Sequence, residues 1–360
     1  QGLRTHRGTG VMSTPRPLPE RDLAEIATLA EDDLRELEGT RIFITGGTGF
    51  VGTWLLEALR WYDVRTSRGP KVDVLTRDPE GFRRRSPHLV DGEMVRFVAG
   101  DVRSRLEVFV QPDFIIHAAT PASAKLNHES PELMLDTIVE GMYSVLEMAA
   151  EADRPRILFT SSGAVYGRQP SAVYGLPEDH EPEPEALVGL GAYHEGKRIA
   201  EQLCVEATAA GDAEVVTGRL FAFIGPHLPL DTHFAVGNFI RDALAGGPVV
   251  VGGDGTPFRS YQYAADLVVW LLALLVRGES GRVYNVGSDY AIDIASLAKM
   301  VAAEVGDVAV EIHGIPDPSC PAERYVPDCS RARTELGLAN AVALDEAIRR
   351  TAAWHRDQGR

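Results

Sequence analysis

A glycine-rich turn between a short apolar strand and a helical pattern constrains this chain more than any other feature. The apolar segment 41–44 leads into the turn, and a helical run follows near Trp54. Glycines at 46, 49 and 52 permit a tight turn, close approach of the backbone to a pyrophosphate, and close packing of helix on strand. The N–H groups at the start of the helix then face the phosphates. We therefore predict a dinucleotide site formed by Gly46, Thr48, Gly49, Phe50, Val51 and Gly52.

The rest of the first two thirds of the chain repeats the strand-then-helix pattern. The strands that we expect are residues 41–45, 72–76, 95–99, 114–118, 156–161 and 214–221. Such alternation predicts an α/β fold of the Rossmann type, with a doubly wound parallel sheet. From Pro226 onward the pattern becomes irregular, with helices expected near 236–246, 262–277, 293–305 and 343–356.

These patterns predict three parts of the chain. Residues 12–38 form an N-terminal helical extension, and residues 39–225 form the NAD(P)-binding domain, with the sixth strand and its flanks shared. Residues 226–360 form a smaller α/β substrate-binding domain over the carboxyl ends of the strands, where ligands bind in such sheets. Residues 1–11 are left out of the fold prediction.

Composition excludes several classes of partner. The 360 residues include 36 Lys and Arg against 52 Asp and Glu, so a formal charge of −16 argues against a nucleic-acid ligand. No apolar run reaches the length of a membrane span. The cysteines, Cys204, Cys320 and Cys329, lack metal-ligand spacing and fit reduced thiols. We expect a cytoplasmic protein with no metal and no membrane partner.

A tyrosine and a lysine four residues apart indicate proton-transfer chemistry. On a helix, Tyr193 and Lys197 share one face, and a nearby ammonium would lower the pKa of the phenol. Ser162 follows the fifth strand, where its hydroxyl could hydrogen-bond a substrate oxygen. An exposed Tyr/Lys pair and ordinary turn chemistry at the serine are the alternatives. The upstream dinucleotide turn favours a catalytic set of Ser162, Tyr193 and Lys197.

These motifs together resemble the extended short-chain dehydrogenases/reductases, in the branch of nucleotide-sugar epimerases and dehydratases. The resemblance covers about residues 41 to 355 and rests on the following segments: Thr45-Gly46-x-x-Gly49-x-x-Gly52, Gly100-Asp101-Val102, His117-Ala118-Ala119, Ser161-Ser162-x-x-Val165-Tyr166-Gly167, Tyr193-x-x-x-Lys197, Gly225-Pro226, Gly237-Asn238-Phe239-Ile240, and Gly253-Asp254-Gly255 leading to Arg259-Ser260-Tyr261.

The resemblance implies roles for individual residues. Asp101 and Val102 would contact the adenine, and Ala118, Ala119 and Thr120 would line the nicotinamide-ribose channel. Lys197 would also hold the nicotinamide ribose, and Tyr193 would lie beside the cofactor. Substrate-binding residues would be Ser123, Ser162, Gly163, Asn238 and Arg259. A guanidinium suits a diphosphate, although Arg259 could instead form a surface salt bridge.

The chain departs from this family at two places. Sugar 4,6-dehydratases of this branch carry an Asp-Glu pair after the hydroxyl residue, and its decarboxylases keep a carboxylate there, whereas this chain has Gly163 and Ala164. The second strand ends in Thr76-Arg77-Asp78 instead of the acid typical of NAD-specific members. Arg77 suits a ribose phosphate and hence NADP, although Asp78 could turn inward and serve NAD.

The resulting hypothesis is an NADPH-dependent 4-ketoreductase of a nucleoside-diphosphate 4-keto-6-deoxyhexose. The main alternative is a nucleotide-sugar 4-epimerase with tightly bound NAD. A 4,6-dehydratase and a non-catalytic dinucleotide sensor are weaker alternatives, the latter because Ser162, Tyr193 and Lys197 are all present. The helices expected at 131–150 and 193–210 could form a homodimer through a four-helix contact, as the resemblance implies.

Overall fold

A computed structural model describes residues 17–90, 92–106, 111–120, 124–181, 191–231 and 234–358. In these parts of the chain, a seven-stranded parallel sheet has the order β11-β6-β5-β4-β1-β2-β3. The predicted doubly wound α/β fold is confirmed. Its strands are β1 (Arg41–Thr45), β2 (Lys71–Thr76), β3 (Val95–Ala99), β4 (Phe114–His117), β5 (Arg156–Ser162), β6 (Glu214–Leu220) and β11 (Val283–Val286).

Strand β11 was not predicted from the sequence. It lies after the segment that becomes irregular at Pro226, yet Val283–Val286 pairs in parallel with Thr217–Leu220 of β6. The chain therefore returns to the main sheet after forming the helices and short strands of residues 223–277. The predicted division into domains stays a prediction.

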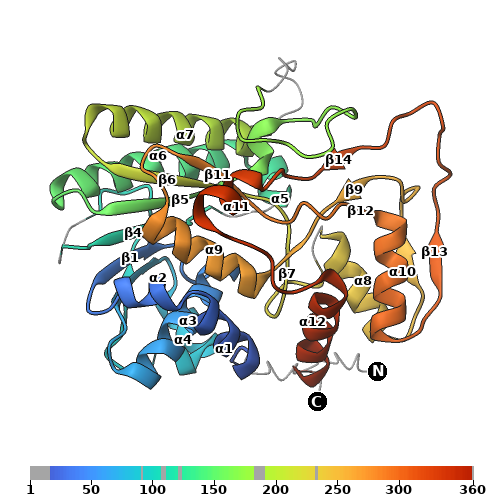
Figure 1. Cartoon of the computed structure of the whole chain (residues 1–360), viewed down its shortest axis with the longest axis horizontal. Helices are drawn as coiled ribbons and strands as arrows, with labels where there is room; N and C mark the ends of the chain where they lie inside the picture. The colour runs from blue at the N-terminus through green and yellow to red at the C-terminus, as the bar shows by residue number, and fades with distance from the viewer. Residues whose placement is uncertain are drawn as a thin grey trace, which may run out of the picture.

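Helices cover both faces of the sheet. Figure 1 shows α6 and α7 on one face and α2, α3 and α9 on the other, with α8, α10 and α12 grouped beyond one end of the sheet. The helices are α1 (Glu20–Leu29), α2 (Glu31–Glu36), α3 (Phe50–Thr66), α4 (Pro79–Arg85), α5 (Ala124–Glu129), α6 (Pro131–Glu151), α7 (Gly191–Ala210), α8 (Ala235–Leu244), α9 (Ala264–Arg277), α10 (Ile294–Val305), α11 (Ser330–Leu336) and α12 (Leu344–Gln358), with 3₁₀ turns η1 (Pro87–Leu89) and η2 (Gly163–Tyr166).

Helix α9 is the central element of the larger core. Every residue from Ala264 to Leu275 is buried, as a helix that is apolar on all sides requires. Its only early charge, Asp266, accepts hydrogen bonds from the backbone N–H groups of Ala341 and Val342 at 3.0 and 3.1 Å. No helix within the described ranges is long and apolar enough to span a membrane.

Short strands build the region beyond the sheet. They are β7 (Phe223–Ile224), β8 (Val249–Val251), β9 (Phe258–Arg259), β10 (Gln262–Tyr263), β12 (Ile292–Asp293), β13 (Val310–Ile312) and β14 (Arg324–Tyr325). Strand β9 lies between β12 and β14 in a small sheet. This pairing places Tyr325 opposite Arg259.

Candidate active site

The glycine turn after β1 has the geometry that a dinucleotide requires. Gly46 has a φ of 72°, and a Cβ on it would lie 2.3 Å from the carbonyl oxygen of Ala118. A Cβ on Gly52 would lie 2.3 Å from the Cα of Gly47. The helix begins at Phe50, earlier than the expected start near Trp54, so its free N–H groups lie directly beside the turn. The residues present therefore fit a dinucleotide pyrophosphate.

Thr45 ties this turn to the end of β4. Its Oγ1 accepts hydrogen bonds from the backbone N–H groups of Ala118 and Ala119, both at 3.2 Å, and lies 2.8 Å from Nδ1 of His117. Burial, together with the charge of Lys197, lowers the pKa of His117 to about 3, so this histidine is neutral. The Thr45 hydroxyl can then donate to Nδ1. Sequence analysis did not identify Thr45 as a supporting residue.

Lys197 lies at the junction of the predicted cofactor and catalytic residues. Its Nζ donates to Oγ1 of Thr120 at 3.0 Å and to the carbonyl of Thr160 at 2.7 Å, and the side chain is buried. Burial lowers the pKa of Lys197 to about 7, while the charge of Glu201 partly opposes this effect. The structure thus brings Lys197 and Thr120 together, and their role in cofactor binding stays a prediction.

Tyr193 and Ser162 meet at the end of β5. Ser162 accepts a hydrogen bond from the backbone N–H of Ala164 at 3.1 Å and interacts with the Tyr193 hydroxyl. Burial raises the pKa of Tyr193, and the Ser162 hydrogen bond only partly offsets that rise. The expected lowering of this pKa by Lys197 is therefore wrong here, because Nζ lies 6.0 Å from the phenol ring centre and is directed to Thr120 and Thr160.

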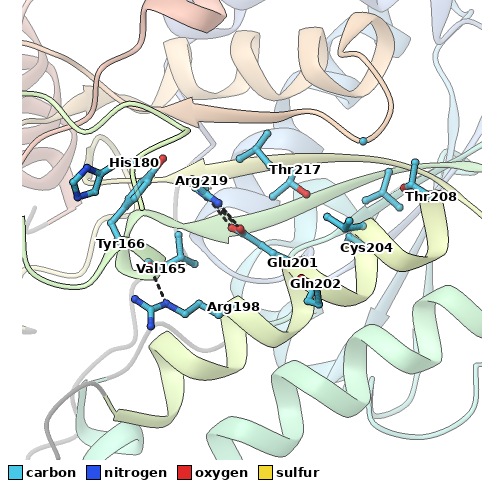
Figure 2. Close-up of a pocket in the computed structure, with 14 residues that line it drawn as sticks. Val165, Tyr166, His180, Arg198, Glu201, Gln202, Cys204, Thr208, Thr217 and Arg219 are labelled. Carbon is cyan, nitrogen blue, oxygen red and sulfur yellow. Dashed lines mark hydrogen bonds and ion pairs between the residues drawn. The ribbon is translucent and has the colours of Figure 1, made fainter. Parts of the chain in front are cut away.

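A half-buried ion pair lies behind the serine segment. Glu201 lies one helical turn beyond Lys197, accepts a hydrogen bond from Ser161 at 2.5 Å, and pairs with Arg219 of β6 at 2.6 Å. Figure 2 shows this pair in a cavity of about 310 Å³ between α7 and β6, where Arg198 also reaches the carbonyl of Val165. The network connects α7 to the end of β5 next to Ser162. Sequence analysis did not find it, because its members are distant along the chain.

The end of β2 gives Arg77 and Asp78 different surroundings. The Asp78 side chain caps α4 by accepting a hydrogen bond from the N–H of Gly81 at 2.8 Å. Arg77 is exposed and has no hydrogen bond or ion pair with any residue that the structure describes. Hydrogen bonds from Arg103 lower the pKa of Asp101 to about 2, so Asp101 is an anion beside the predicted adenine position.

Residues predicted to bind substrate lie around the small sheet and β5. The Arg259 guanidinium donates to the carbonyl of Phe258 at 2.8 Å and lies 3.9 Å from a Glu323 carboxylate oxygen. Asn238 on α8 accepts a hydrogen bond from Arg241 at 3.2 Å. The predicted residue Ser123 lies outside the described residues, so its role stays a prediction.

Gly163 has surroundings that the sequence could not indicate. A Cβ built on it would lie 2.7 Å from the hydroxyl oxygen of Tyr325 and 2.7 Å from Cζ of Phe221. Tyr325 was not among the predicted site residues. The dipeptide strand that carries it is too short to show periodicity, and its position depends on pairing with β9.

Comparison with known proteins identifies the family. The model of the NAD dependent epimerase/dehydratase family matches residues 42–287. UDP-glucuronic acid decarboxylase 1 of Xenopus tropicalis is 31% identical over 332 residues, which are 90% of this chain and 74% of the relative. UDP-glucuronic acid decarboxylase 1 of Arabidopsis thaliana is 31% identical over 325 residues, 88% of this chain and 70% of the relative. The chain belongs to the NAD-dependent epimerase/dehydratase family.

Solved structures agree with the fold. The UDP-glucose 4-epimerase of Thermotoga maritima, solved with UDP-glucose, has a TM-score of 0.76 at 21% identity and covers 89% of this chain and 100% of its own. A dTDP-glucose 4,6-dehydratase of Streptomyces venezuelae, solved with NAD, has a TM-score of 0.73 at 22% identity and covers 88% and 97%. The predicted resemblance is confirmed at the level of the family by the family model and the sequence relatives. Across the described residues no cluster of His, Cys, Asp and Glu could hold a metal ion.

Proposed function

We propose that this protein is an NADPH-dependent reductase of a nucleoside-diphosphate 4-keto-6-deoxyhexose. The observation that carries the proposal is the composition of the segment after β5. Ser162 interacts with Tyr193 close to Lys197, whereas the next position is Gly163, which has no ionisable group. The groups needed to protonate a carbonyl oxygen are present at this segment, and the carboxylate used for loss of water or carbon dioxide is not.

The side chains of the site have complementary tasks in this reaction. Burial keeps Tyr193 protonated, so its hydroxyl can donate a proton to the oxygen that forms at C4. Ser162 would hold the same oxygen before the transfer. Lys197, fixed by Thr120 and Thr160, lies where it can hydrogen-bond a ribose hydroxyl. A bound nicotinamide cofactor would supply the hydride.

In our proposal this chain does not catalyse the decarboxylation for which its relatives are named. Placing a carboxylate at position 163 would require a Cβ within 2.7 Å of Tyr325 and Phe221. Contacts that short oblige the neighbouring atoms to move, and the phenol ring of Tyr325 packs 4.7 Å from the ring of Phe221, centre to centre. The segment is thus packed around a glycine.

The cofactor proposal rests on β2. Asp78 already serves as the cap of α4, so it is occupied in a role other than ribose binding. Exposed Arg77 is free to pair with a ribose phosphate, which its planar guanidinium can bind through two hydrogen bonds. We therefore favour NADPH over NADH.

The decisive experiment is a spectrophotometric assay with a supplied nucleoside-diphosphate 4-keto-6-deoxyhexose. We expect stoichiometric loss of NADPH and formation of a 6-deoxyhexose. In a parallel reaction, an intact nucleoside-diphosphate hexose such as dTDP-glucose should give no 4-keto-6-deoxy product. Mass loss of one water in that reaction would contradict the proposal and show that a carboxylate distant in sequence reaches the site.

A 4-epimerase is the second candidate, because the family that matches is described as NAD-dependent. Tyr193 would remove and return the hydroxyl proton beside Ser162 and Lys197, while the hydride of C4 would pass to a bound NAD and return to the opposite face. In that case a nucleotide hexose would be converted to its epimer with no net change in nicotinamide absorbance. The same spectrophotometer trace separates the two candidates.

We also propose a homodimer that pairs α6 and α7 of two copies. Both helices carry exposed apolar side chains, with 47% of Tyr143 and 48% of Val205 exposed to solvent. Paired helix faces would bury them and yield a four-helix contact. Sedimentation or light scattering tests this, and a Tyr143→Glu/Val205→Glu variant should shift the mass to that of one chain.

A further inference from the structure

The first turn of α7 receives a hydrogen-bond acceptor from another helix. The backbone N–H of Tyr193 donates to Oδ1 of Asn127 on α5 at 2.9 Å, and the two residues lie 66 positions apart in the chain. Tyr193 is the third residue of α7, so its N–H is among the first four, which have no acceptor within the helix. Asn127 therefore caps α7 from a separate element of the fold.

The start of α7 is suited to a cap that comes from elsewhere. Neither Leu190, just before α7, nor Gly191, its first residue, has a side chain with an acceptor. Asparagine is among the preferred capping residues, because its amide oxygen accepts from backbone N–H groups. Gly191 has a φ of 70°, and a Cβ on it would lie 2.7 Å from Nδ2 of Asn127. The glycine therefore leaves room for the amide directly beside the start of the helix.

The chain after β4 thus contacts both members of the Tyr193/Lys197 pair. Thr120 accepts a hydrogen bond from Nζ of Lys197 at 3.0 Å, and Asn127 accepts one from the N–H of Tyr193. Helix α5 packs against both α6 and α7, and Leu126, next to Asn127, packs onto the same apolar cluster as Tyr193. Two hydrogen bonds one helical turn apart fix the rotation of α7 and its position along its axis.

We propose that Asn127 is a positioning residue of the active site, which caps α7 so that the first turn of this helix holds the Tyr193 phenol at the reacting carbonyl. This inference rests on the proposed reduction and deepens it. The hydrogen bond uses the backbone N–H of Tyr193, so the hydroxyls of Tyr193 and Ser162 both stay available for the oxygen at C4. Asn127 acts only through the backbone of Tyr193 and does not touch the substrate in this scheme.

Loss of the cap would act on Tyr193 more than on Lys197. The Tyr193 N–H would lose its acceptor, and the first turn of a helix is the part that opens most easily. Lys197 lies one turn further into α7 and would keep its hydrogen bonds to Thr120 and Thr160. The expected result is a proton donor that is less often in place, beside a cofactor site that is unchanged.

The test compares three full-length variants. Asn127→Leu removes the acceptor and keeps a side chain of similar size, whereas Asn127→Asp keeps an acceptor and adds a negative charge, which a helix N-terminus favours. Asp63→Leu is the matched control, because Oδ1 of Asp63 accepts the N–H of Gly69 at 3.1 Å and a Cβ on that glycine would lie 2.5 Å from Cβ of Asp63. This contact comes just before β2, at the amino end of the sheet and away from the site.

Nuclear magnetic resonance measures the cap without any substrate. Each protein is labelled with tyrosine carrying ¹⁵N at the amide and ¹³C at the phenolic carbon, and a Tyr193→Phe sample identifies both Tyr193 signals. Asn127→Leu should speed exchange of the Tyr193 amide hydrogen with solvent by roughly three- to thirtyfold, the scale of one lost helix cap. It should also move the phenolic signal, because the ring would spend less time in its present surroundings. Asn127→Asp and Asp63→Leu should keep both signals and the exchange rate close to those of the wild type.

Turnover tests the consequence for the reaction. With NADPH and dTDP-4-keto-6-deoxyglucose, Asn127→Leu should lower kcat by roughly three- to thirtyfold, because the proton donor loses its geometry. KM and the Kd of NADPH should stay within about twofold, and Asn127→Asp should restore most of the lost turnover. An unchanged exchange rate or phenolic signal in Asn127→Leu overturns the inference. So does an equal response in Asp63→Leu, or a sugar reduced by Asn127→Leu with unchanged kcat.

The two measurements separate this inference from the proposed function. If no keto sugar consumes NADPH, the proposed reaction fails, while the Tyr193 amide and phenolic signals still decide whether Asn127 caps α7 and positions the phenol. If the sugar is reduced and neither signal responds in Asn127→Leu, the reaction stands and the inference falls.

Discussion

The cofactor side and the substrate side of this site are built in different ways. On the cofactor side, Gly46 and Ala118 follow β1 and β4, neighbouring strands whose register is set over several residues. On the substrate side, Tyr325 and Arg259 belong to strands of only two residues each, joined across a long stretch of chain. A local motif therefore defines where the dinucleotide lies, whereas long-range packing decides what surrounds the reacting atoms. Relatives with one glycine turn can consequently differ in the reaction they perform.

The largest expected effect separates chemistry from cofactor binding. Tyr193→Phe should lower turnover by roughly a hundredfold or more, the usual scale of general acid–base help, because the phenol proton is lost. NADPH affinity should change little, since the ring still packs. Turnover and fluorescence titration with NADPH check both statements. A variant that keeps more than half of the wild-type turnover would remove Tyr193 from the mechanism.

A change at the end of β2 tests the cofactor side alone. Arg77→Ala should weaken NADPH by about ten- to a hundredfold and NADH much less, because a charge-assisted hydrogen bond contributes about 1.5–3 kcal/mol. Arg84→Ala, at another exposed arginine nearby on α4, is the control. Equal losses for both cofactors in Arg77→Ala would point to a structural role and favour NAD.

A methyl group at position 163 tests how tightly the substrate side is packed. Gly163→Ala should lower the free energy of unfolding by about 1–3 kcal/mol, because the new Cβ would meet Tyr325 and Phe221. Gly252→Ala is the control, since its Cβ would contact no atom within 4 Å. Adding Tyr325→Phe should restore part of the loss by removing one of the three atoms that lie within 3.0 Å of the new Cβ. Chemical denaturation measures all four proteins, and equal stability of the two alanine variants would refute the crowded site.

The last prediction concerns the pH dependence of stability and Lys197, which lies between the cofactor side and the substrate side. Burial lowers the pKa of Lys197 to about 7, below the ordinary lysine value, so the unfolded chain binds more protons above neutrality. This group therefore adds stability as pH rises. Relative to Lys197→Met, the wild type should gain about 2 kcal/mol between about pH 7 and pH 9. Lys299→Met, at an exposed lysine of α10, should show no such trend.

Sequence patterns predicted those parts of the molecule whose structure is determined by residues close together in the chain. Strand β1 was predicted at its observed bounds, and the glycines around Gly46 predicted the turn, because apolar alternation and glycine geometry act over a few residues. Helical spacing placed Tyr193 and Lys197 on one helix, yet it could not show that the ammonium is directed to Thr120 and Thr160. The direction of the ammonium depends on Thr120 and Thr160, which are far from Lys197 in the sequence.

The unpredicted features share one physical reason. Strand β11 has only four residues, and what makes it a strand is the unpaired edge of β6. Tyr325 has no periodic neighbours, and its contact with Gly163 arises where the small β12-β9-β14 sheet meets the segment after β5 of the main sheet. Such contacts cannot be read from residue type or spacing, since they exist only when the rest of the chain has folded.

The late return of β11 to the sheet has a consequence for how the protein is made. During synthesis the strands up to β6 leave the ribosome well before Val283–Val286 can pair with Thr217–Leu220. Until then the edge of β6 presents free N–H and C=O groups, and α9, which buries the sheet beneath it, is also missing. In a chain that stops near Pro226, the edge of β6 would stay unpaired permanently. We therefore expect the dinucleotide-binding part expressed by itself to aggregate, and nascent chains of intermediate length to depend on chaperones.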